Sequence, residues 1–354
     1  MRDNPIVGSA TMKNKGLGCL LAFVIVALLV SLALNFVSFA AVLGMGLDSA
    51  SIGYVEPKQK FRETLVEAGA AETKDKIVRI DIEGIIASGP AGDLFSEGGM
   101  NVDAIQRALE QASEDKNVKA IVIRVNSPGG EVTASDNLYN AVKKAAEKKK
   151  VVVYMDSIAA SGGYYLACGA SKIVANETTL TASIGVIIQS LNYSQTFGKV
   201  GLETMTFASG KFKDTLSGSR PMREDEREYI QSLVSAMYDK FVGIVAKARN
   251  IDEAQLRTGV ADGRVVTGKQ ALEYKLVDQL GYVEDAYALA KELGSAKDAM
   301  VVKYSLTPSL AQLLGIMGKA QASSTGKVEL DVSDRLLPRL EAGKPYLLPA
   351  HMVR

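Results

Sequence analysis

The sequence predicts an α/β fold with a mainly parallel sheet, and three features support this prediction. Near-continuous apolar runs at 118–127 and 150–155 are typical of strands that are buried on both faces. Amphipathic patterns at 101–114 and 133–147 predict helices that alternate with these strands. The links between the segments are short, as they are in parallel βαβ units. A ligand site is therefore expected at the carboxyl ends of the strands.

The remaining segments extend this pattern along the chain. Further strands are expected at 76–88, 171–177, 182–191 and 202–208. A long helix with one apolar stripe is expected at 224–249, followed by short helices at 252–258, 268–275 and 284–293.

A long apolar run near the N-terminus predicts a membrane anchor. Residues 16–47 carry no charge, and about 20 apolar residues are enough to cross a bilayer. Lys13 and Lys15 precede the run, and positively charged flanks stay on the cytoplasmic side. The rest of the chain is therefore expected on the outer side, periplasmic or extracellular, of a bacterial cytoplasmic membrane. A cleaved signal peptide, with Ser38 and Ala40 before the cut, is the alternative, but the run is long for one.

The chain is expected to fall into five segments. They are a cytoplasmic N-terminus (1–15), a transmembrane anchor (16–47), a linker (48–75), a globular domain (76–300) and a C-terminal tail (301–354). A short amphipathic helix near the membrane is the alternative for the linker. The net charge of +1 gives no support for nucleic-acid binding.

The candidate nucleophile lies in a tight turn at 155–169, between an expected strand and an apolar helix. Ser161 in this turn precedes two glycines and would lie where backbone N–H groups at the helix start are free. A serine so placed can attack a carbonyl carbon while N–H groups bind the oxyanion. A second glycine turn, at 127–131, ends a neighbouring strand at the same edge of the sheet. The alternative is that Ser161 only caps the helix.

The scarcity of histidine and cysteine limits the chemistry. The one histidine, His351, lies close to the C-terminus, so a Ser-His-Asp triad is not expected, and a zinc site with two histidines is excluded. The two cysteines, Cys19 and Cys168, offer neither a disulfide framework nor a cysteine-rich metal site. A base for Ser161 is therefore expected to be a lysine or a carboxylate.

Two lysines are candidates for this base. Lys211 and Lys213 lie in a small, glycine-flanked loop after an expected strand, although a solvated surface lysine is the default for this residue type. A lysine acts as a base only where its pKa falls from about 10.4 toward roughly 7–8. A short polar side chain such as Ser183 could orient the neutral amine.

Several motifs together resemble the signal peptide peptidase A family, also called protease IV. They are VNSPGG (125–130), DSIAASGGYYLAC (156–168), TASIGVI (181–187), SGKFKD (209–214) and ADGRVVTGKQALEYKLVDQLG (261–281). They occur in the family's order over about residues 76–295. Each alone is weak, but the set is specific, and its single copy resembles the short form of the family.

The resemblance implies a Clp-protease and crotonase-like fold of repeated ββα units, with a Ser-Lys dyad and no cofactor or metal. The family's serine falls on Ser161, and its oxyanion donors fall on the backbone N–H groups of Gly130 and Gly162. Its lysine falls on Lys213, because the Gly-x-x-Lys-Asp spacing fits that residue and not Lys211. A serine that positions the lysine falls on Ser183.

The resemblance also implies substrates and partners. It implies a serine endopeptidase that degrades remnant signal peptides and other membrane-associated or unfolded peptides. Short-form members are ring-shaped homo-oligomers, octameric in the family's model, in which neighbouring subunits supply the serine and the lysine of one site. The segment 338–354 is either a self-substrate or a disordered end. A crotonase-type acyl-CoA enzyme and a catalytically silent membrane scaffold are the alternative functions.

Overall fold

The computed structural model describes residues 15–42, 60–88, 101–306 and 346–347, and the chain divides into two units, 1–59 and 60–354. The first unit contains α1 (Lys15–Val42), a helix of 28 residues within which apolar side chains from Phe23 to Phe36 are exposed. Within the described parts of the chain, no helix has both the length and the apolar character needed to cross a bilayer. A helix is thus present near the expected place, and its insertion into a membrane stays a prediction.

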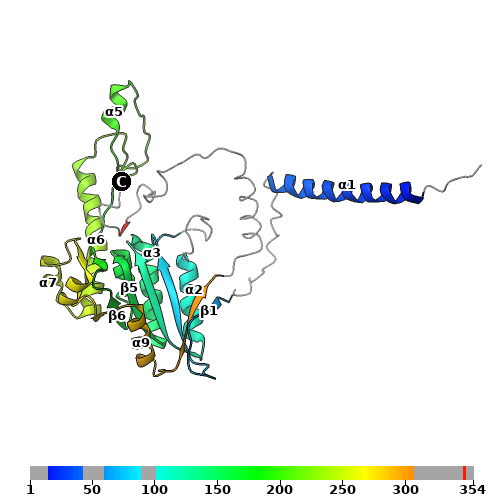
Figure 1. Ribbon diagram of the computed structural model, residues 1–354. Helices are drawn as coiled ribbons and strands as arrows, with labels where there is room; N and C mark the ends of the chain where they lie inside the picture. Colours follow the sequence, from blue (N-terminus) through cyan, green and yellow to red (C-terminus); the bar gives the residue numbers. More distant parts are fainter. Residues whose placement is uncertain (1–14, 43–59, 89–100, 307–345, 348–354) are drawn as a thin grey trace, which may run out of the picture. The chain divides into compact units, whose positions relative to one another are not determined.

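The second unit is built on a nine-stranded sheet (Figure 1), whose main path runs β1-β10-β2-β3-β5-β6-β9, with β7 beside β5 and β8 beside β7. The central strands β2, β3, β5 and β6 are all parallel, as the alternating pattern predicted. The strands are β1 (Arg62–Glu67), β2 (Lys76–Glu83), β3 (Val118–Ser127), β5 (Lys150–Ala160), β6 (Lys172–Ala175), β7 (Leu180–Ala182), β8 (Val265–Thr267), β9 (Gln279–Leu280) and β10 (Met300–Ser305).

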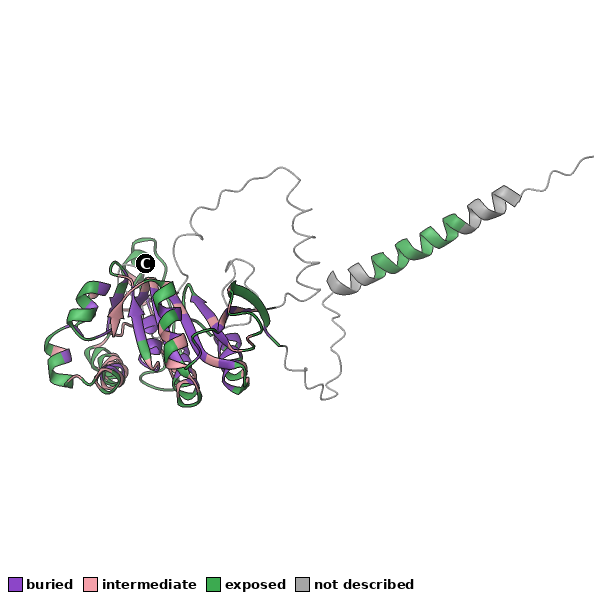
Figure 2. Cartoon of the chain, turned by 60° about the horizontal axis from the view of Figure 1, so that its bottom comes forward, coloured by how far each residue is buried: buried purple, intermediate pink, exposed green. Residues whose placement is uncertain are grey.

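Helices cover both faces of this sheet. The helices of the second unit are α2 (Val102–Glu114), α3 (Val132–Lys148), α4 (Gly162–Ala167), α5 (Ser194–Lys199), α6 (Glu224–Arg249), α7 (Glu253–Thr258), α8 (Gly268–Glu273) and α9 (Val283–Leu293). Along β3, Ile121 and Ile123 pack in the cluster with α2, α3 and α4, whereas Ala120 and Val122 pack in the cluster with α9. Because successive strand residues face opposite sides, the apolar run in β3 is continuous. The central strands are accordingly buried over most of their length (Figure 2).

Most predicted elements are confirmed, but two strands are not. The expected strand at 182–191 contributes only its first residue to β7, and the expected strand at 202–208 has no regular structure. Both segments lie between β7 and α6. Residues 202–208 belong to an arm between these two elements that projects away from the sheet (Figure 1), and their apolar side chains are exposed, with Phe207 94% accessible. Ile184, in the other segment, is buried in the core although its segment forms no strand after Ala182. An apolar pattern forms a strand only where a partner strand accepts its hydrogen bonds.

The sheet also extends past both ends of the expected 76–300 segment. Residues 62–67, expected in a linker, form the edge strand β1. β1 pairs antiparallel with β10, which lies parallel to β2 and continues to Ser305. β1, which precedes the expected globular segment, is thus held by β10, which lies at the C-terminal end of that segment.

The contribution of one tertiary contact of α4 to stability can be tested at Tyr164, whose hydroxyl binds the segment after α8. This fully buried hydroxyl donates a hydrogen bond to the carbonyl of Leu276 at 2.9 Å. We expect Tyr164→Phe to lower the free energy of unfolding by about 1–3 kcal/mol, because the buried carbonyl loses its donor. Denaturant unfolding monitored by circular dichroism measures the change. The exposed Tyr274 is the matched control, and an equal loss in Tyr274→Phe would contradict this assignment.

Candidate active site

Ser161 occupies a strained turn between β5 and α4. Its φ of 52° and ψ of −111° lie outside the regions that residues with a side chain favour. The turn is held by β7, because Ala182 pairs with Ala160 and the carbonyl of Ala182 accepts the Ser161 N–H at 2.7 Å. Strain of this kind persists only where the surroundings determine the conformation, and it is common at functional sites.

The side chain of Ser161 has no structural task in the described part of the chain. Its hydroxyl is fully buried and has no hydrogen-bond partner, and it makes no capping bond to α4. Ser161 therefore occupies the N-cap position of α4, but its side chain does not cap the helix. A buried, unpaired hydroxyl costs about 1–3 kcal/mol, so the stability of the fold does not account for this hydroxyl.

The glycine turn after β3 packs directly against the Ser161 turn. A Cβ atom added to Gly162 would lie 3.2 Å from the nitrogen of Gly130 and 3.1 Å from the Cα of Gly129. A Cβ atom on Gly130 would lie 1.8 Å from the carbonyl oxygen of Ile86. Only glycine therefore fits at either position. The structure brings together the two residues whose N–H groups were expected to bind an oxyanion.

Ser135, on α3, packs against the same two turns. Sequence patterns did not identify it as a site residue. Its buried hydroxyl donates to the carbonyl of Glu131 at 2.8 Å and would lie 2.3 Å from a Cβ atom on Gly162. Within the sequence, Ser135 is one more small polar residue on an amphipathic helix. No local pattern marks it, because its importance depends on a contact between distant segments.

Ser183 lies next to the Ser161 turn, and its hydroxyl is engaged with the backbone. It follows β7 directly, and both Ala182 and Ser183 have positive φ angles, 61° and 51°. The Ser183 N–H donates to the carbonyl of Arg264 at 2.9 Å, and its Oγ donates to the carbonyl of Gly263 at 3.3 Å. In the described residues, Ser183 is therefore held by the segment before β8 and not by a lysine.

Lys213 lies on the arm between β7 and α6. Its turn is closed by the Lys213 N–H, which donates to the carbonyl of Gly210 at 3.0 Å. Its side chain is exposed, and among the described residues no hydrogen bond or ion pair involves its amine. The amine of Lys211, by contrast, is paired with Asp225. Ser161, Gly130 and Gly162 thus lie together, and among the described residues no hydrogen bond or ion pair links Lys213 to them.

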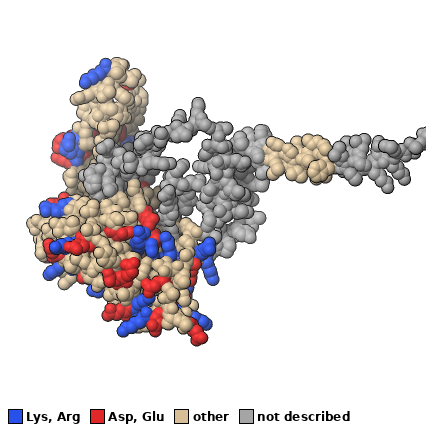
Figure 3. All heavy atoms as spheres, viewed as in Figure 1, with Lys and Arg blue, Asp and Glu red and all other residues tan. Residues whose placement is uncertain are grey.

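The arm exposes an apolar surface beyond this turn. Its large exposed side chains are Leu191, Val200, Leu202, Met205 and Phe207. Contiguous apolar exposure of this kind marks an interaction surface. In Figure 3 the acidic and basic side chains of the body are interspersed, whereas the upper arm carries few charges.

A short segment near the C-terminus lies beside the glycine turn. β11 (Tyr346–Leu347) pairs antiparallel with β4 (Gly130–Glu131), with Leu347 opposite Gly130. This is how an extended peptide adds to the free edge of a strand. A groove of about 740 Å³ between α2 and α3 includes none of these residues.

The family model and two relatives at 40% identity point to one family. The model of peptidase family S49 matches residues 143–297. A protein named signal peptide peptidase SppA, from Enterococcus faecium, is 40% identical over 247 residues, which cover 69% of this chain and 71% of that protein. A protein named protease slr0021, from Synechocystis, is 40% identical over 221 residues, which cover 62% of this chain and 75% of that protein.

More distant similarities extend to a chloroplast protein and to a solved structure. The serine protease SPPA of Arabidopsis thaliana is 34% identical over 226 residues, covering 63% of this chain and 33% of that protein. A ClpP1 mutant from Listeria monocytogenes superposes with a TM-score of 0.40 at 18% identity, covering 59% of this chain and 93% of that one. A superposition at this level does not decide a fold.

The close packing at Gly162 can be tested by a double-mutant cycle. We expect Gly162→Ala to destabilise the protein by about 1–3 kcal/mol, because the new methyl group overlaps Ser135 and the Gly129–Gly130 turn. Adding Ser135→Ala should recover part of this loss, since it removes the nearest atom. Gly198→Ala, with open space around it, is the control. Strictly additive effects in urea titrations would show that Ser135 and Gly162 are not in contact.

Proposed function

Because this chain belongs to peptidase family S49 and is a serine peptidase, we propose that it cleaves peptides with Ser161 as nucleophile and Lys213 as general base. The observation that carries this proposal is the buried, unpartnered hydroxyl of Ser161 at a strained turn beside Gly130 and Gly162. A nucleophile, two N–H donors and a route for a peptide strand are the parts that acyl transfer requires.

The proposed reaction has two stages. Neutral Lys213 accepts the proton of Ser161 while Ser161 Oγ attacks the scissile carbonyl carbon, and the N–H groups of Gly130 and Gly162 bind the oxyanion. As the first residue of α4, Gly162 has no acceptor for its N–H inside that helix. Protonated Lys213 then donates its proton to the leaving amine. Water then attacks the acyl carbon while Lys213 accepts its proton, and Lys213 returns that proton to Ser161 Oγ as the acyl–oxygen bond breaks.

The lysine of each site comes, in this proposal, from a neighbouring subunit of a ring. Lys213 is exposed on a projecting arm, and its amine has no bonded partner among the described residues of its own chain. The arm also carries exposed apolar side chains, of which Phe207 is the most accessible. A second copy that covers this surface would bury apolar area and place Lys213 in a less solvated setting. Desolvation lowers a lysine pKa, as a general base requires.

Peptides are proposed to bind as a strand added to β4. The pairing of β11 with β4 places an extended segment beside Gly130, one of the proposed oxyanion donors. Backbone pairing of this kind suits unfolded peptides, because its hydrogen bonds are made to the main chain of the peptide. Remnant signal peptides and other membrane-associated or unfolded peptides are the proposed substrates, with the chain's own C-terminal segment as a further one.

A membrane anchor is proposed for the N-terminal unit. The uncharged run at 16–47 and the helix α1 support it, and Lys13 and Lys15 support a cytoplasmic N-terminus. The peptidase unit would then lie on the outer side of a bacterial cytoplasmic membrane, where exported signal peptides are left behind. No observation in the described residues specifically favours an acyl-CoA enzyme or a silent scaffold.

Two alanine variants test the dyad. The full-length protein in detergent micelles is incubated with a fluorogenic peptide of small and apolar residues. We expect Ser161→Ala to abolish cleavage and Lys213→Ala to lower kcat by about 10²–10⁴-fold, the usual contribution of a general base. Lys211→Ala is the matched control, since Lys211 lies on the same turn and is paired with Asp225. Cleavage by Ser161→Ala at the rate of the unmodified protein would refute the mechanism.

Mixed oligomers test whether two subunits share one site. Ser161→Ala and Lys213→Ala chains, each inactive alone, are co-expressed in equal amounts and purified as one assembly. About one quarter of the sites should then be active, because random mixing gives each site an intact serine and an intact lysine with probability one half each. Sites formed within one chain would give no recovery, and that outcome would contradict the shared arrangement.

A further inference from the structure

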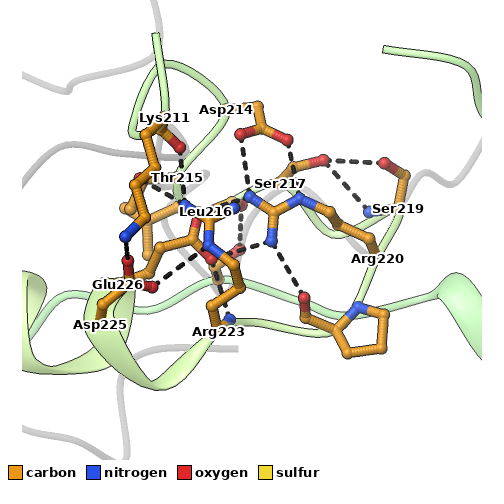
Figure 4. Close-up of polar contacts among 12 residues, drawn as sticks. Lys211, Asp214, Thr215, Leu216, Ser217, Ser219, Arg220, Arg223, Asp225 and Glu226 are labelled. Atoms are coloured by element: carbon orange, nitrogen blue, oxygen red, sulfur yellow. Dashed lines mark hydrogen bonds and ion pairs between the residues drawn. The ribbon is translucent and has the colours of Figure 1, made fainter. Parts of the chain in front are cut away.

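A cluster of charged side chains surrounds the turn that carries Lys213 (Figure 4). The guanidinium of Arg220 lies between two carboxylates and binds both. It donates to Asp214 from Nε at 2.7 Å and from Nη2 at 2.9 Å, and to Glu226 from Nη1 at 2.8 Å. Arg220 therefore ties the lysine turn to the first turn of α6, because Asp214 directly follows Lys213.

Arg223 binds the other side of the same turn. Its Nη2 donates to the carbonyl of Lys211 at 2.7 Å and contacts Glu226 at 2.8 Å, and its N–H donates to Glu226 at 2.9 Å. Lys211 and Asp214 flank Lys213 on its two sides. Both flanks are thus fixed to Glu226 through arginines, while the amine of Lys213 itself stays unbonded among the described residues.

Glu226 is the anchor of this cluster. With 1% of its surface exposed, it is the least accessible charged residue in the described part of the chain. Hydrogen bonds from Arg220, and then from the N–H of Arg223, lower the pKa of Glu226 to about 2 despite the opposing effect of desolvation. The stabilisation from this carboxylate is therefore complete above its unfolded pKa, about 4.5, and is lost only as the pH falls toward 2. The anchor stays charged throughout the range in which a peptidase lysine titrates.

We propose that Arg220 is a positioning residue of the peptidase site, which ties the segment after Lys213 to α6 through Asp214 and neutralises that carboxylate. The proposal rests on the proposed function, in which Lys213 is the general base. Arg220 acts through Asp214 and Glu226 and does not touch the substrate. The planar guanidinium of Arg220 suits this task, because its N–H groups bind two carboxylates at once.

Two separate effects follow from this arrangement. The first is geometric, because a base that is misplaced by about 1 Å can cost 10²-fold in rate. The second is electrostatic. The hydrogen bonds from Arg220 lower the pKa of Asp214 and neutralise its charge. An unpaired carboxylate beside Lys213 would favour the protonated amine, which cannot act as a base. Among the other charged groups nearby, Lys211 is paired with Asp225, which Arg223 also contacts at 3.2 Å, and Glu224 is paired with Arg227 at 3.4 Å.

The test compares Arg220→Met, Arg220→Lys and Asp214→Asn in the full-length protein, using the same fluorogenic peptide. For Arg220→Met we expect kcat to fall about 10²-fold with little change in KM, and the acidic limb of the kcat/KM profile to move to higher pH. Arg220→Lys keeps the charge and should leave that limb in place while kcat still falls. Asp214→Asn removes the negative charge and should move the limb to lower pH.

The control is a second arginine that bridges α6 to another element. Arg257 on α7 pairs with Asp239 at 2.9 Å, far along α6 from the lysine turn, so Arg257→Met should leave kcat and the profile unchanged. Unchanged kcat and pH profiles in all three test variants would overturn the proposal. So would a loss that size-exclusion chromatography traces entirely to failed assembly. Full activity in Lys213→Ala would instead refute the proposed function on which this inference rests.

Discussion

The contact between two turns determines how this molecule presents its chemistry. The Ser161 turn keeps its positive φ because β7 accepts its N–H and because the Gly129–Gly130 turn fills the space beside Gly162. No side chain fits between the two turns, so glycine is required on both sides. Because these turns end neighbouring parallel strands, β5 and β3, the sheet itself sets their distance. The position of the serine therefore depends on the core of the protein and not on a surface loop.

The proposed base, Lys213, lies on a turn that is fixed by ion pairs and not by hydrophobic packing. Its turn lies on an arm without sheet partners, so hydrophobic packing cannot fix it, and a cluster of ion pairs at the start of α6 does so instead. Glu226 is buried and Arg220 is half-buried, and the planar guanidinium of Arg220 binds two carboxylates, which makes this cluster more directional than an ordinary surface pair. A site shared between subunits, as proposed, requires a nucleophile that is rigid within the core and a lysine that is fixed separately on an arm.

Sequence patterns predicted the sheet well because its central strands are buried on both faces and leave long apolar runs, as in β3. They failed at 202–208, where an apolar segment is exposed on the arm and pairs with no described strand. The glycines and Ser161 were found because motifs mark them. Ser135 was not found, since only the fold brings α3 against Gly162. The role of Arg220 is likewise invisible in sequence, where it is one basic residue among many.

The most direct test of the central claim identifies the nucleophile chemically. The full-length protein is treated with an organofluorophosphonate, which reacts with activated serine hydroxyls, and its peptides are analysed by mass spectrometry. The account predicts one adduct, on the peptide that contains Ser161, and much slower labelling in Lys213→Ala. An adduct on a different serine, with Ser161 unmodified, would contradict it.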